Sequence, residues 1–191
     1  DVQLRKNLWK NSRMEWLVTR NYAPDDKGRI GEEFVHNFIK KYTPYESIWE
    51  ADSNTGNMDG SIYDVFINNY RTEVKLATAG VDRKKNKLKY SFQHENIYKE
   101  KIWDKLFLFD VEPNGVYLTI INHSDMVFGK DIHPIFKKKS TRHLAAHKFD
   151  MSLTSLKRGI ENNLTLYLSW DDYKDSTELP KLPSFLKTHF S

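Results

Sequence analysis

The chain has 191 residues, of which 39% are hydrophobic and 14% aromatic, so it can bury a core without disulfides and is not a disordered chain. It contains no cysteine, which excludes a disulfide scaffold and any zinc site with cysteine ligands, and favours a reducing cytoplasm. Lys and Arg number 30 against 26 Asp and Glu, a mildly basic balance. No apolar run approaches the roughly 18 residues of a membrane span, and residues 1–20 lack a signal-peptide core. We therefore expect a soluble protein with no membrane segment.

The first part of the chain predicts two helices and a short strand. Apolar residues at mostly helical spacing indicate an amphipathic helix within residues 1–20, which NYAPDDKGR then interrupts. Between Ile30 and Tyr42 the apolar residues recur with the 3.6-residue period of a helix that packs on one side. Residues 47–51 are read as a strand before the turn-rich segment DSNTGNMDG.

Strands dominate the predictions for the rest of the chain. DVFINNYRTEVK, residues 64–75, indicates two short strands, and a polar basic loop follows at 81–89. KYSFQ is predicted to be extended, NIYKEKIWDK helical, and LFLFDV a strand buried on both faces. Two further strands, VYLTII and LTLYLSW, precede a proline-containing tail. This order predicts a mixed sheet covered by helices, in one domain over residues 1–191.

The hairpin at residues 64–75 carries three charges that a plain hairpin does not need. Asn68 and Asn69 suit the central positions of a tight turn because Asn tolerates positive φ, and counting back from them places Asp64 opposite Glu73. Alternation then puts both acids and Lys75 on one face, with a core face behind them. Like charges across a ladder are destabilising, so the pair calls for Lys75 or a divalent metal as counter-charge. Alternatively, Glu-x-Lys occurs by chance on exposed sheet surfaces.

At these residues the sequence resembles the PD-(D/E)xK nuclease superfamily, the fold of many type II restriction endonucleases. The matching residues are Asp64 and then Glu73-Val74-Lys75, each within an apolar strand, whereas Tyr63 stands where the family has proline. The resemblance implies an α/β fold with a restriction-endonuclease-like mixed β-sheet flanked by helices. It implies a catalytic core at about residues 28–121.

The family commonly carries a glutamate on the helix before the first of these strands, and IGEEFV resembles that segment. A helical wheel places Gly31 in the middle of the apolar face, Glu32 at its border and Glu33 nearly opposite. Glu32 is therefore the candidate site residue, and Gly31 allows the helix to approach the sheet. Acids in a first helical turn are equally explained by the helix dipole. Gln93 in SFQHENI is a further candidate, although a polar residue at a strand end explains it as well.

The resemblance also implies a mechanism. Asp64, Glu73 and the backbone carbonyl of Val74 would hold Mg²⁺, for which Mn²⁺ could substitute, and Lys75 would position or activate the attacking water. Glu32 would hold a second metal or orient the water ligands of the first. The reaction implied is cleavage of double-stranded DNA at a specific sequence, leaving 5′-phosphates, in a prokaryotic or phage cytoplasm. Cutting both strands takes two active sites, so a homodimer is expected.

Contacts with DNA are expected from two basic segments, one at residues 82–89 and one within the region 131–191, which we assign to DNA recognition or dimerisation. Lysines suit phosphates and arginine suits guanine, although a lysine run is usually a solvated loop. His143 and His147 would lie one turn apart on a helix, but they lack the further ligands of a zinc site. The candidate DNA contacts are Arg83, Lys84, Lys85, Lys87, Lys89, Lys137, Lys138, Lys139, Arg142 and His143.

Other functions stay open at this point. A repair, recombination or transposon-end nuclease would share the same fold and site. A non-catalytic nucleic-acid-binding protein would explain the basic segments, and an interaction domain would explain only the fold. Neither gives a reason for acids at both Asp64 and Glu73. If Asp64 is not the essential acid, Asp59 in NMDG is the next candidate.

Overall fold

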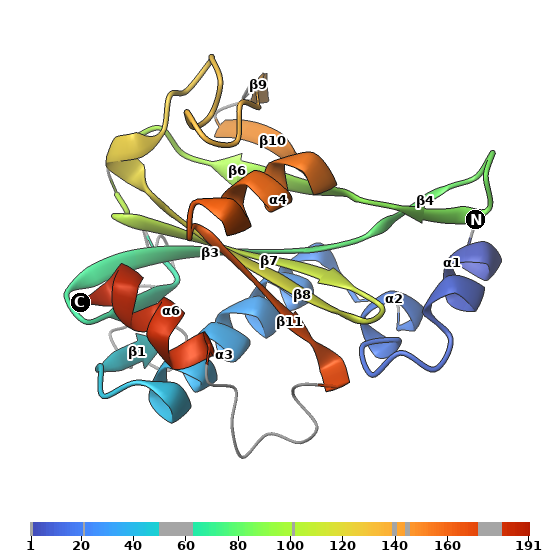
Figure 1. The fold of residues 1–191 in the computed structure, drawn as a ribbon, viewed down its shortest axis with the longest axis horizontal. Coiled ribbons are helices and arrows are strands. Elements are labelled where there is room, and N and C mark those ends of the chain that lie inside the picture. The colour runs from blue at the N-terminus through green and yellow to red at the C-terminus, as the bar shows by residue number, and fades with distance from the viewer. Residues whose placement is uncertain are drawn as a thin grey trace.

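Six strands form one mixed sheet within the residues described by the computed structural model, which are 2–20, 22–49, 63–100, 102–138, 141–143, 146–171 and 181–191. The strand order is β1-β2-β3-β7-β8-β11 (Figure 1). β3 and β7 run parallel, whereas the other neighbours are antiparallel. The predicted α/β class with a mixed sheet is therefore confirmed. The strands are β1 Ser47–Trp49, β2 Val65–Ile67, β3 Tyr70–Thr78, β7 Lys105–Glu112, β8 Gly115–Asn122 and β11 Thr165–Ser169.

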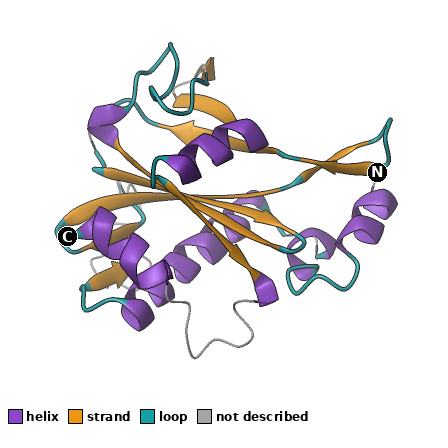
Figure 2. Cartoon of the chain, in the orientation of Figure 1, coloured by secondary structure: helices purple, strands orange, loops and turns teal. Residues whose placement is uncertain are grey.

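The connection from β3 to β7 consists mainly of strands in the described part of the chain. The hairpin of β4 (Gly80–Asp82) and β5 (Lys87–Lys89) projects from the end of β3, where a loop was predicted (Figure 2). β6 (Ser91–Ile97) returns beside β10 (Ala146–Ser152), which also pairs with β9 (Thr141–His143). The predicted helix in NIYKEKIWDK is wrong, because its first two residues end β6 and 98–100 and 102–104 form turns and loop. Asn96 has a left-handed φ of 56° that a helix does not accept, and the next residue, Ile97, pairs with His147 of β10.

Helices cover one face of the six-stranded sheet through an aromatic layer. Phe109 contacts Phe34 and Phe38 of α3, with ring centroids 6.0 and 5.7 Å apart. Phe190 of α6 stacks on Phe107, and the two strand residues share a face because they are two positions apart. The one-sided helix packing predicted from the apolar spacing is confirmed. The helices are α1 Val2–Trp9, α2 Trp16–Thr19, α3 Pro24–Tyr42, α4 Leu153–Glu161 and α6 Lys181–Phe190, with a 3-10 helix η2 at His123–Asp125.

The opposite face of the sheet packs against the β6-β10-β9 sheet and α4 (Figure 1). Asp110 of β7 lies on this side and contacts His94 of β6, with 2.8 Å between Oδ1 and Nε2. α4 begins where the side chain of Ser152 accepts a hydrogen bond from the backbone N–H of Ser155. The central sheet therefore lies between a helical layer and a second layer of strands and helix.

Two further predictions differ from the structure. The helix expected over residues 1–20 is two helices, α1 and α2, separated near Asn11, whose φ of 67° ends the first helix. The segment of His143 and His147 forms the β9–β10 hairpin, so the predicted helical spacing of these two residues is wrong. The proline-containing tail ends in α6.

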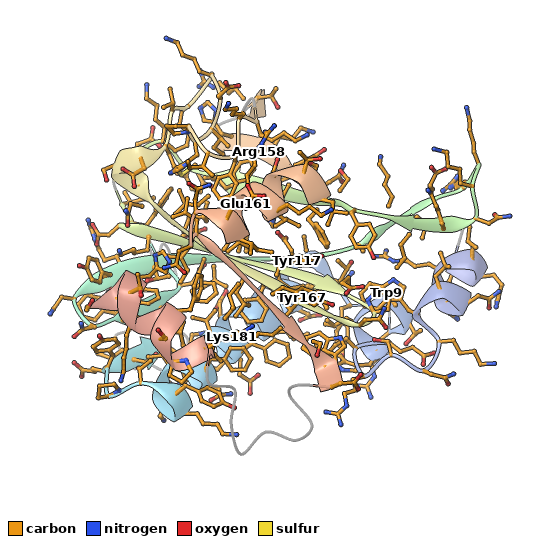
Figure 3. The ribbon with its side chains drawn as sticks, viewed as in Figure 1. Trp9, Tyr117, Arg158, Glu161, Tyr167 and Lys181 are labelled. Carbon is orange, nitrogen blue, oxygen red and sulfur yellow. The ribbon has the colours of Figure 1, made fainter. Side chains whose placement is uncertain are left out.

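Tyr117 of β8 and Tyr167 of β11 lie side by side across the sheet, with ring centroids 4.7 Å apart (Figure 3).

Gly31 sets the distance between α3 and β3. A Cβ at this position would lie 3.0 Å from Leu76 Cβ and 3.6 Å from Val74 Cγ1. We expect Gly31→Leu to lower the free energy of unfolding by about 1–3 kcal/mol, because the added side chain overpacks this contact. Urea unfolding followed by circular dichroism measures the change. Glu33→Leu, at an exposed position of the same helix, is the control and should stay within about 0.5 kcal/mol of the parent.

Candidate active site

The hairpin that carries the candidate site has the predicted turn and register. Asn68 and Asn69 both have positive φ, 42° and 73°, and Val65 lies opposite Thr72. Val65 and Thr72 are buried on the core face, as alternation predicted. Asp64 lies one position beyond the last paired residue, where its backbone N–H still donates to the Thr72 carbonyl, 3.0 Å away. Asp64 therefore lies at the end of the β2–β3 ladder.

At this point a backbone group of β3 forms its hydrogen bond with the side chain of Asp64 and not with a neighbouring strand. Asp64 Oδ2 accepts a hydrogen bond from the backbone N–H of Val74 at 2.7 Å. The N–H and C=O of one strand residue point to the same lateral side, so the Val74 carbonyl faces the same edge as Asp64. An acidic side chain and a backbone carbonyl oxygen therefore lie at one opening in the sheet.

Glu73 and Lys75 form an ion pair on the face of β3 that looks toward β6. Lys75 Nζ lies 2.5 Å from Glu73 Oε1, and Glu73 is only 7% exposed. Burial acts to lower the pKa of Lys75, but Glu73, Asp64 and Glu32 outweigh it, so the pKa is raised above the ordinary value. Lys75 is accordingly a cation surrounded by carboxylates.

The carboxylates of this cluster repel one another in a partly buried setting. Burial, and next the charge of Glu73, raise the pKa of Asp64 to about 7, although Lys75 and the Val74 N–H favour its charged form. Burial and then Asp64 raise the pKa of Glu32. Glu32 Oε2 also accepts a hydrogen bond from the indole N–H of Trp49 at 2.8 Å, which opposes that rise. Lys75 and Arg29 also act to lower the pKa of Glu32, but burial and Asp64 outweigh them.

A cavity of about 460 Å³ opens onto this cluster between α3, β3 and β6. Its lining brings together most of the residues predicted for the site, namely Glu32, Asp64, Val74, Lys75 and Gln93. Glu73 adjoins them through its ion pair with Lys75. Glu33 is exposed, and Asp59 lies outside the described residues.

The sequence interpretation missed two cations of this cavity. Lys27 and Arg29 line it from the first turns of α3, and Arg29 also lies over the ring of Trp49, 6.0 Å from the ring centroid. The available signal was their position four and three residues before Gly31 and Glu32, which puts them near the same side of the helix.

The oxygen donors suit a hard divalent cation. Asp64, Glu73 and the Val74 carbonyl are all oxygen ligands, the type that Mg²⁺ takes, and burial followed by the charge of Glu73 raises the pKa of Asp64. In the described part of the chain no three His, Asp or Glu side chains converge as one ligand group. The proposed set needs only two carboxylates beside the carbonyl, so the residue types fit such an ion.

The candidate DNA-binding residues fall into two separate places. Those of the first segment lie on the β4–β5 hairpin, where Arg83, Lys84 and Lys85 form its exposed turn. Those of the second segment lie at and before β9, which is at another end of the molecule (Figure 1). Lys139 lies outside the described residues, as does the side chain of His143. The exposed or half-buried members are Lys87, Lys89, Lys137, Lys138 and Arg142.

A comparison of the chain with protein-family models, with curated proteins and with solved structures found no match. Among the described helices, none is both long enough and apolar enough to cross a membrane. The site geometry is therefore the basis for assigning a function.

Proposed function

We propose that this protein is a Mg²⁺-dependent DNA endonuclease with a restriction-endonuclease-like fold that leaves 5′-phosphates. The observation that carries the proposal is the opening at the edge of β3, where Asp64 holds the Val74 N–H beside the Glu73–Lys75 pair. Acids that lie close together in a partly buried site are costly for folding alone, which favours a role in binding a cation.

Each residue of the cluster has a distinct part in this chemistry. Mg²⁺ held by Asp64, Glu73 and the Val74 carbonyl would supply charge neutralisation at the scissile phosphate and a lowered pKa for bound water. Lys75 donates hydrogen bonds and so orients the attacking water toward the phosphorus. Glu32 is fixed by the Trp49 indole and holds further water molecules in place. Gln93, which lines the cavity from β6, orients the substrate.

The proposal extends to the substrate and the assembly. The basic hairpin and the β9 region would grip the phosphates of double-stranded DNA. A homodimer would place one site on each strand and read a sequence with two-fold symmetry. The same site would serve a repair or recombination nuclease, so the cleavage pattern decides between these functions.

Cleavage of phage-length DNA in Mg²⁺, with EDTA as the control, tests the proposal. Discrete bands support a site-specific endonuclease, whereas a smear supports a nuclease of the same fold without sequence specificity. Binding of DNA without any Mg²⁺-dependent cleavage, across several unrelated genomic DNAs, would support a non-catalytic nucleic-acid-binding protein.

Lys75→Ala is expected to lower the cleavage rate about 100-fold or more, because the water then loses its positioning cation. Lys40→Ala, at an exposed position of α3 remote from the cavity, is the matched control and should cleave like the parent protein. Rates are compared at equal folded concentration, verified by circular dichroism. An undiminished rate for Lys75→Ala would remove this residue from the mechanism.

A further inference from the structure

A second cavity, of about 420 Å³, adjoins the candidate active site. Its lining residues belong to α1, the start of α3, and the strands that lead into and out of the β4–β5 hairpin. Lys27, Leu76 and Gln93 line both this cavity and the first one. The two cavities therefore lie next to each other, and together they are called the groove; the second is the one nearer the projecting hairpin.

The charge of the groove changes along its length, from a mixture of carboxylates and cations to cations alone. The part near Asp64 contains carboxylates, whereas the second cavity is lined by Arg5, Lys27 and Lys89 and by no Asp or Glu of the described residues. Further cations follow at the hairpin turn, where the backbone N–H groups of Lys84 and Lys85 bond to Asp82 Oδ1 and fix the turn. The groove thus continues into a basic arm.

Burial in the groove disfavours the charged forms of Arg5 and Lys27. Burial, and then the charge of Arg5, lower the pKa of Lys27, and burial lowers the pKa of Arg5. Arg5 Nη2 donates to Thr78 Oγ1, while Arg5 Nε is buried without a hydrogen-bond partner among the described residues. A buried donor and two mutually repelling cations are satisfied together by one bound anion.

We propose that the second cavity binds backbone phosphates of the nucleic-acid strand, next to the phosphate that reaches Asp64 and Glu73. This inference rests on the proposed function for the identity of the anion. Arg5 supplies the planar donor group, Lys27 the cation shared with the active site, and Lys89 the link to the hairpin. The strand then runs along β6 toward the arm, and the cleaved bond lies at the acidic end of the groove.

Binding of a short fluorescein-labelled DNA duplex, measured by anisotropy in EDTA over a series of salt concentrations, tests the site without requiring cleavage. Lys27→Gln is expected to weaken binding several-fold and to reduce the slope of log K against log salt by about 1, as loss of one phosphate contact does. Lys89→Gln should have the same effect. Because Lys89 is exposed and lies on a different element, this variant tests the site even if Lys27→Gln disturbs the folding of α3. Lys40→Gln is the charge-matched control and should bind like the parent.

The outcomes separate this proposal from the proposed function. An unchanged salt slope in both Lys27→Gln and Lys89→Gln, or a parent protein that does not bind DNA, would overturn the phosphate site. Equal displacement of the DNA by polyglutamate and by unlabelled DNA would point to an acidic polypeptide instead, and would overturn it too. If the two variants lose binding as expected while the parent never cleaves DNA, the phosphate site stands and the nuclease assignment fails.

Discussion

Asp64→Asn is expected to abolish DNA cleavage and, in the same protein, to stabilise the metal-free fold. Loss of a carboxylate from the proposed metal site should lower the cleavage rate by about 100- to 1,000-fold or more. The amide oxygen of Asn can still accept the Val74 N–H, so the edge of β3 keeps its hydrogen bond. The substitution removes only the charge that burial and Glu73 penalise. Replacing a residue that serves function at the expense of stability removes activity and stabilises the fold, whereas replacing a structural residue lowers both activity and stability.

The difference in free energy of unfolding between Asp64→Asn and the parent should increase with pH, in favour of the variant. The pKa of Asp64 rises from 3.8 to about 7 on folding, so the folded state holds this proton more tightly than the unfolded chain. Below the unfolded value both states are protonated and Asp64→Asn should match the parent. As the pH rises toward 7 and above, the parent should lose stability relative to the variant, by up to a few kcal/mol at about 1.4 kcal/mol per pKa unit.

Urea unfolding in EDTA at acidic, neutral and mildly basic pH measures this difference. Adding Mg²⁺ should raise the midpoint of the parent at neutral pH and leave Asp64→Asn nearly unchanged, since a ligand stabilises only the state that binds it. Glu33→Gln, at an exposed position of α3, is the control and should respond to Mg²⁺ like the parent. A variant that is less stable than the parent at every pH, with or without Mg²⁺, would contradict the proposed role of Asp64.

The hairpin of the site could be predicted because its determinants are local. The Asn68-Asn69 pair demands a two-residue turn with positive φ, and the turn fixes the register of every residue behind it. The wheel position of Gly31 likewise follows from helical periodicity and gives its close approach to Leu76. The end of the β2–β3 ladder at Val65 could not be predicted in this way, because β2 also pairs with β1 on its other side, a contact between segments that are separate in sequence.

Other features depend on packing between segments that are distant in sequence. NIYKEKIWDK has helical spacing of apolar residues, yet its first residues pair with β10 and contribute to a layer over the sheet. Pairing with a strand some 50 residues away, at His147, overrides the local preference. The basic groove could not be predicted from the sequence either. Its residues Arg5, Lys27 and Lys89 come from distant parts of the chain and line one cavity only in the folded protein.

The largest stability effect outside the site is expected at Asp110. Its carboxylate contacts the imidazole of His94 across the two layers, and both side chains are fully buried. Burial raises the pKa of Asp110, although the neighbouring His94 opposes that rise. Asp110→Ala would leave the imidazole buried without its partner, and breaking a buried pair of this kind costs about 3–5 kcal/mol. Asp131→Ala, an exposed change, should stay within about 0.5 kcal/mol of the parent.

A double-mutant cycle shows whether the two groups act as a pair. The double variant His94→Leu, Asp110→Ala should lose less stability than the sum of the single variants, because it leaves no polar partner stranded in the core. Hydrogen exchange should show faster opening of β6 and β10 in the single variants, since this contact ties their layer to β7. β6 also carries Gln93 into the candidate site, so looser packing here should weaken DNA binding as well. Additive losses of stability, with unchanged exchange in β6, would mean that the contact does not hold the two layers together.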